Sequence, residues 1–151
     1  MVAAYTFLLL NLAMSLYNVG VIWAHEVDIF RSWRLIPAGD FPTVQGVHWR
    51  KLPYWVFAPY ALSIAGALAL LAYHPDHAPT WTLVGNALCQ VLALVLTAVM
   101  WAPWQYRLSR DAAGPRSRYL DYILRTHWIR TSLITAAGCF LLICLGVIGA
   151  S

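Results

Sequence analysis

Apolar residues fall into four long runs, separated by three segments that are richer in polar residues. The runs cover roughly residues 2–24, 52–73, 81–102 and 126–150. Each run is long enough to cross roughly 30 Å of hydrocarbon as a helix that rises about 1.5 Å per residue. Helices are favoured because a spanning segment must satisfy its own backbone hydrogen bonds, and the alternation of a transmembrane strand is absent. The pattern predicts an all-α fold: an integral membrane four-helix bundle in a single domain, residues 1–151.

The positive charges lie beside the predicted spans. Of the 151 residues, 61% are hydrophobic and 11% are charged, with a formal net charge of +4. All ten Lys and Arg residues fall in or next to the first and third connections, and residues 74–80 contain none. If the helices alternate, these cations share one side, which the positive-inside rule places in the cytoplasm. We therefore expect a multi-pass protein of the inner (plasma) membrane, with both termini outside the cytoplasm.

The first cytoplasmic loop carries a helix signal of its own. Asp40 is a candidate N-cap, and Pro42 would lie in the first turn. A helical face then recurs at spacings of three and four, at Phe41, Val44, His48 and Lys51. This pattern predicts a short interfacial helix. In the third connection, a helix that starts near Ser117 would continue into the fourth run.

Polar residues inside the runs recur at helical spacing. They form one face per run: Asn11, Ser15, Asn18 and His25; Asn86, Gln90 and Thr97; His127, Arg130, Thr131 and Thr135. Polar groups in hydrocarbon are costly unless they are paired, so these faces should point into the bundle. They serve either as hydrogen-bonding contacts between helices or as the lining of a site.

Ionisable residues collect near the cytoplasmic end of the predicted bundle, at His25, Glu26, His48, His127 and Arg130. Arg130 lies about one turn deeper than His127, and a cation at that depth needs an anionic partner. Three uses fit this group. His25 and Glu26, with His48 and His127, suit a transition metal; two imidazoles suit haem; and a histidine with Arg130 suits an acid–base pocket without a cofactor. The structural alternative is a set of interfacial histidines with a Glu26–Arg130 ion pair.

Tryptophan is concentrated at the same end. Seven of the eight Trp residues lie at or near the cytoplasmic boundary: Trp23, Trp33, Trp49, Trp55, Trp101, Trp104 and Trp128. They fit an interfacial aromatic belt, or they wall a pocket for a flat ligand. For the second interpretation, the candidate substrate-binding residues are Asn18, Trp49, Trp101 and Trp128.

Short motifs mark the ends of the runs: YNVGVIW in the first, HWRKLPYWVFAP entering the second, WAPW closing the third and RTHWIRT opening the fourth. Together they resemble the anthrone-oxygenase-like family of small four-helix integral membrane proteins. The resemblance implies oxidation of anthrones to anthraquinones with dioxygen. At the matching positions it implies roles for His48, Trp49, His127, Trp128 and Arg130 with Thr131.

We therefore predict a membrane-embedded, oxygenase-like oxidoreductase that acts near the cytoplasmic face on a lipophilic planar aromatic of the anthrone, phenol or quinone type. His48 or His127 would be base or ligand, and Arg130 would stabilise an oxyanion. The cofactor is open between haem, a transition metal and none. The expected partners are the lipid bilayer and a lipophilic small molecule, and no basic groove indicates nucleic acid. The alternatives are a non-enzymatic accessory or self-assembling subunit, forming a homo-oligomer through small residues, and a haem or quinone carrier.

Overall fold

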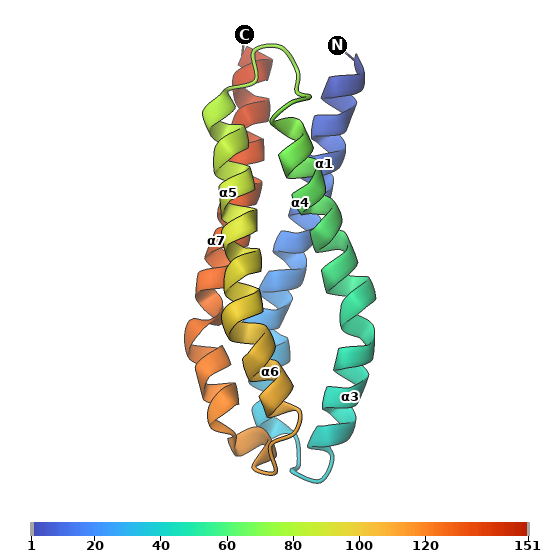
Figure 1. The fold of residues 1–151 in the computed structure, drawn as a ribbon, viewed down its shortest axis with the longest axis vertical. Coiled ribbons are helices and arrows are strands. Elements are labelled where there is room, and N and C mark those ends of the chain that lie inside the picture. The colour runs from blue at the N-terminus through green and yellow to red at the C-terminus, as the bar shows by residue number, and fades with distance from the viewer. Residues whose placement is uncertain (1, 151) are drawn as a thin grey trace.

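Long helical segments run up and down along one axis, and both termini lie at the same end of the molecule (Figure 1). The computed structural model describes residues 2–150. Within that range, four segments are long and apolar enough to cross a membrane: Val2–Leu35, Phe41–Leu70, Thr80–Leu108 and Arg118–Ala150. The predicted all-α fold with four spanning helices is confirmed, and the protein is a multi-pass membrane protein.

Three of the four spanning segments are built from several helical elements. The α-helices are α1 (Val2–Ala24), α2 (Phe30–Ser32), α3 (Phe41–Leu52), α4 (Ala58–Leu70), α5 (Thr80–Leu96), α6 (Ala102–Leu108) and α7 (Arg118–Ala150). Turns of π-helix join them at η1 (His25–Ile29), η3 (Pro53–Phe57) and η4 (Thr97–Trp101), and short 3-10 turns are η2 (Trp33–Leu35) and η5 (Gly114–Arg116). The fourth segment is α7 alone, a single helix of 33 residues.

Proline accounts for two of the π turns. Pro53 opens η3, and Pro103 follows η4 in the first turn of α6. Proline has no N–H to donate to the carbonyl four residues earlier, so a wider turn keeps each helix continuous across it. All three π turns lie in the half of the bundle away from the termini (Figure 1). Such π bulges are frequent at functional sites.

The helix predicted in the first connection is present as α3. It continues through η3 into α4, so the second spanning segment begins at Phe41 and not near Leu52. The reason is the π turn, which lets the helix pass Pro53. Asp40 precedes α3 but makes no side-chain capping bond. The predicted last helix is confirmed, because α7 begins at Arg118 and runs to Ala150.

The polar faces predicted for the runs point into the bundle. The buried members are Asn11, Ser15, Asn18, His25, Asn86, Gln90, His127 and Thr131. Thr97, Arg130 and Thr135 are half-buried. Helix α7 packs against both α1 and α5, which brings the faces of the first, third and fourth segments together.

The two larger clusters of the apolar core lie at the two ends of the bundle. Near the termini it is mainly aliphatic, with Leu8, Leu12, Leu70, Leu83, Leu141 and Cys144. Near the connections it is rich in aromatic rings, with Phe30, Trp33, Phe41 and Trp101 packed beside Leu108, Leu120 and Ile123. The predicted site residues therefore lie against the aromatic part of the core.

Candidate functional site

Glu26, His127 and Arg130 form a hydrogen-bonded chain between η1 and α7. Nη2 of Arg130 lies 2.5 Å from Nε2 of His127, and Nδ1 of His127 lies 2.8 Å from Oε2 of Glu26. A guanidinium only donates, so Nε2 of His127 accepts and its ring proton is on Nδ1, which donates to Glu26. The chain therefore sets one tautomer of His127 and occupies both of its ring nitrogens.

Glu26 is held from its other side by Arg31. Arg31 donates from Nη2 to Oε1 of Glu26 over 3.1 Å, and from Nε to the Glu26 carbonyl over 2.9 Å. The alternative of a direct Glu26–Arg130 ion pair is therefore realised only indirectly, because His127 lies between the two groups. Asp121, another carboxylate on this side of the bundle, pairs with Arg34.

Arg130 lies at the wall of a small cavity. Its guanidinium is 5.1 Å from the centroid of the Trp101 ring, and Nη1 donates to the hydroxyl of Thr97 over 3.4 Å. Its Nε has no hydrogen-bond partner among the described residues. Arg130, Asn18 and Tyr60 are among the residues that line a cavity of about 70 Å³. Arg130 therefore brings a positive charge to the side of an apolar space.

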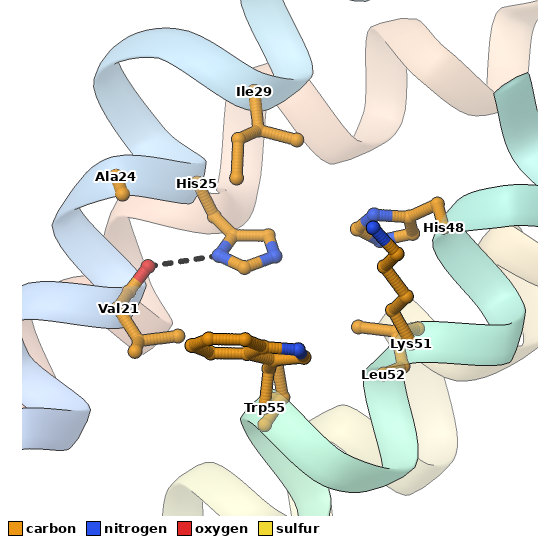
Figure 2. Close-up of a pocket in the computed structure, with 9 residues that line it drawn as sticks. Val21, Ala24, His25, Ile29, His48, Lys51, Leu52 and Trp55 are labelled. Carbon is orange, nitrogen blue, oxygen red and sulfur yellow. Dashed lines mark hydrogen bonds between the residues drawn. The ribbon is translucent and has the colours of Figure 1, made fainter.

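His25 and His48 both line a larger pocket of about 310 Å³ (Figure 2). Their ring centroids are 5.6 Å apart. Nδ1 of His25 lies 2.8 Å from the carbonyl oxygen of Val21, which can only accept, so Nδ1 carries the proton and Nε2 keeps a lone pair. Nε2 of His48 is buried without a hydrogen-bond partner in the described part of the chain. The pocket thus holds an imidazole in the tautomer of a proton acceptor.

The pocket opens at the side of the bundle, between α1–η1 and α3–η3. The lining residues Ala24, Lys51 and Trp55 are exposed, and all three belong to spanning segments. Figure 2 shows the flat indole of Trp55 close to the ring of His25, on the pocket side of the two histidines. Lys and Trp are residue types that occur at the level of lipid headgroups. The pocket is therefore open at the side of the bundle, along spanning segments.

The structure brings most of the predicted site residues to one region: His25, Glu26, His48, His127 and Arg130, with Trp101 and Asn18 beside Arg130. It does not bring Trp49 or Trp128 there. Trp128 is 57% exposed on the outer surface, and Trp49 lines a separate groove with Gln45 and Tyr106. Each of these two residues directly follows a site histidine, and consecutive helical side chains point about 100° apart.

The four predicted metal ligands are divided into two pairs. His25 and His48 face the pocket, whereas Glu26 and His127 bond to each other, and the ring of Phe30 packs edge-on against both His25 and His127. Among residues 2–150, no group of three or more His, Cys, Asp or Glu residues could hold a metal ion. The geometry therefore gives the metal hypothesis no support, and haem binding stays a prediction.

Sequence reasoning did not single out Phe30 or Val56. Phe30 is 1% exposed and lies between the His25–His48 pair and the Glu26–His127 pair, and Val56 lines the pocket of His25 and His48. Both are apolar residues of types that recur throughout this chain, so their types carry no signal. The position of Val56, three residues after Pro53, was the available clue, since a proline inside a spanning helix perturbs the turn that it begins.

No protein-family model, curated protein or solved structure matches this chain. The resemblance to the anthrone-oxygenase-like proteins, and the activity that it implies, stay predictions. The function therefore has to be argued from the chemistry of the site.

Proposed function

We propose that this protein is a membrane-embedded enzyme that removes a proton from a planar, lipophilic phenol or anthrone and so prepares it for oxidation by dioxygen. The main support is the His25–His48 pocket, which opens to the bilayer and adjoins the cavity lined by Arg130. A base and a nearby cation are the two groups needed to form and hold an oxyanion.

His25 is the proposed base. Its Nε2 accepts a proton from the substrate, while the carbonyl of Val21 keeps Nδ1 protonated. Arg130 stabilises the negative charge that develops on the substrate oxygen. His127 has both ring nitrogens engaged, so we assign it as a positioning residue that holds Arg130 through Nε2.

The pocket suits a flat, apolar molecule. Its volume of about 310 Å³ lies at the lower end of the range for small-molecule sites, and its lining is mostly apolar apart from His25, His48 and Lys51. The indole of Trp55 offers a face for stacking against an aromatic ring (Figure 2). We place the site near the cytoplasmic face, because nine of the ten cations flank the connections at this end of the bundle and Arg130 is close to it.

With an anthrone, the reaction balances with one molecule of dioxygen. The ring methylene loses two hydrogens, one oxygen atom becomes the new carbonyl, and the other leaves as water. The anthrone is oxidised to an anthraquinone and dioxygen is reduced. The residues of this chain supply the first step, proton removal, which creates the electron-rich anion that dioxygen oxidises.

The test is oxygen uptake and quinone formation from 1,8-dihydroxyanthrone by the protein in mild detergent, above the rate without protein. We expect His25→Ala and Arg130→Met each to lower kcat/KM about 100-fold. His74→Ala, the same kind of change at the opposite end, is the matched control. The proposal fails if folded protein gives no rate above background, or if both site variants match wild type. Self-association without turnover would instead favour an accessory subunit.

A further inference from the structure

Val56 lies where three cavities meet. We call the pocket of His25, His48 and Trp55 the outer chamber, and the cavity of Asn18, Tyr60 and Arg130 the inner chamber. They measure about 310 Å³ and about 70 Å³, and a void of about 20 Å³ that both His25 and Arg130 line lies between them. Among the described lining residues, Val56 alone borders all three spaces.

We infer that Val56 is a gate between the two chambers and decides which part of a substrate reaches Arg130. The inference rests on the proposed function, because it assigns a route within the same site. It adds a specificity-determining residue that neither touches the transferred proton nor carries charge.

The size of the void between the chambers limits which part of a substrate can extend past Val56. A void of about 20 Å³ holds roughly one water molecule. A ring system does not fit there, but an oxygen atom at the edge of a ring does. The substrate class is therefore a flat ring system that stays in the outer chamber beside Trp55, with one phenolic or ketone oxygen that projects past Val56 towards Arg130.

The position of Val56 in η3 explains how a gate could open. Valine is branched at Cβ and has one strongly preferred side-chain rotamer in a helix, so the side chain itself has little freedom. The turn that carries it begins with Pro53, which donates no backbone hydrogen bond. Its other side chains, Tyr54, Trp55 and Phe57, are 78%, 59% and 43% exposed, so the bundle holds η3 from one side only. We expect movement of the turn to open the path.

Two substitutions change the gate in opposite directions. Val56→Phe adds a ring at the junction and should close the inner chamber, and Val56→Ala removes two methyl groups and should join the chambers. Val99→Phe is the matched control. Val99 also lies in a π turn, is 64% exposed, and lines none of the three spaces.

Side-chain ¹⁵N NMR in detergent, with 2-naphthol as the probe, tests the gate without any turnover. The histidine signals report on the outer chamber. The Nε of Arg130, which has no hydrogen-bond partner in the described residues, reports on the inner one and is assigned by its loss in Arg130→Met. In wild type, Val56→Ala and Val99→Phe, 2-naphthol should shift both sets of signals. In Val56→Phe, the His25 and His48 shifts should persist and the Arg130 shift should disappear.

The outcomes separate the gate from the proposed function. If Arg130 still responds in Val56→Phe, the gate is wrong and the proposed function stands. If Val56→Phe also abolishes the histidine shifts, Val56 controls the whole pocket and the gate is again wrong. If 2-naphthol shifts no histidine signal in folded wild-type protein, the proposed site itself fails, and the gate with it.

Discussion

The half of the bundle near the termini and the half near the basic connections contain the same four spanning segments, but they pack differently. Near the termini, regular α-helices approach each other closely at glycine, as where Gly66 of α4 meets Asn11 of α1. Near the connections, η1, η3 and η4 interrupt the regular helices, and the chambers lined by His25 and Arg130 lie between them.

Polar residues also have different partners in the two halves. Asn86 donates to the carbonyl of Ala137 over 2.9 Å, a side-chain contact to a neighbouring helix backbone. Near the connections, Arg130, His127 and Glu26 bond to one another. One kind of contact joins helices, and the other holds a charge beside a cavity. The same helical spacing of polar residues therefore marks contacts between helices in the half near the termini, and a charged site in the half near the connections.

Removal of Glu26 should have the largest effect on stability. Glu26→Ala leaves the buried Nδ1–H of His127 with only the hydroxyl of Thr131, 3.4 Å away, as an acceptor. It also removes the negative charge nearest to Arg130, and together these losses should cost about 3 kcal/mol of unfolding free energy in detergent. Glu26→Gln keeps an acceptor and should lose less. Asp28→Ala, an exposed carboxylate on the same turn, is the control. A loss no greater than that of Asp28→Ala would mean that the chain is not stabilising.

Gly66→Ala tests the close contact in the other half. A Cβ at position 66 would lie 1.7 Å from Nδ2 of Asn11, so we expect a loss of about 2 kcal/mol. Gly146→Ala is the control, since a Cβ there meets nothing within 4 Å. The double variant Gly66→Ala with Asn11→Ala should recover most of the loss, measured by unfolding in mixed micelles. If Gly66→Ala and Gly146→Ala are equally stable, the close contact between α1 and α4 does not constrain the half near the termini.

Gly85→Ala should have a smaller effect in the same half. A Cβ there would lie 2.8 Å from the ring of Phe140, which is half-buried and can move aside. We expect a loss of about 1 kcal/mol, and recovery when Phe140→Leu is added. The same unfolding measurement decides it, and a loss as large as that of Gly66→Ala would show that the ring is held rigidly.

Asp111 should give the smallest effect, confined to acid pH. The hydroxyl of Ser117 donates to Oδ2 over 2.6 Å and the Ala113 N–H to Oδ1 over 3.0 Å, and these bonds hold the pKa of Asp111 below its ordinary value. The contribution of a group with a lowered pKa is present above its unfolded value and is lost as the pH falls below about 4. Asp111→Asn should therefore narrow the difference in melting temperature between about pH 6 and about pH 3.

Asp40→Asn is the control for this prediction, because Asp40 makes no capping bond. Asp40→Asn should leave the difference in melting temperature between the two pH values as it is in wild type. If Asp111→Asn leaves this difference in melting temperature unchanged, the carboxylate of Asp111 does not stabilise the turn before α7.

The sequence by itself determined the four spanning segments, the faces that point inward and the end at which His25, His48 and His127 gather. The physical reason is that hydrocarbon solvates apolar side chains and excludes unpaired polar ones, so the spacing of polar residues encodes depth and face. His25, at the end of the first polar face, is buried as that spacing predicts. The start of the second segment could not be predicted from the pattern, because a proline such as Pro53 usually marks the end of a helix. Only the structure shows that the helix continues past Pro53 as a π turn.

The tertiary structure alone decided which groups meet. His127 and Glu26 are separated by 101 positions, and no periodicity specifies that α7 lies beside η1. In the same arrangement, Glu26 and Arg130 occupy both ring nitrogens of His127, whereas Nε2 of His25 keeps a lone pair. Val56 borders both chambers and the void between them. Periodicity describes each helix in relation to the lipid, whereas the order of helices around the axis depends on how side chains fit between them.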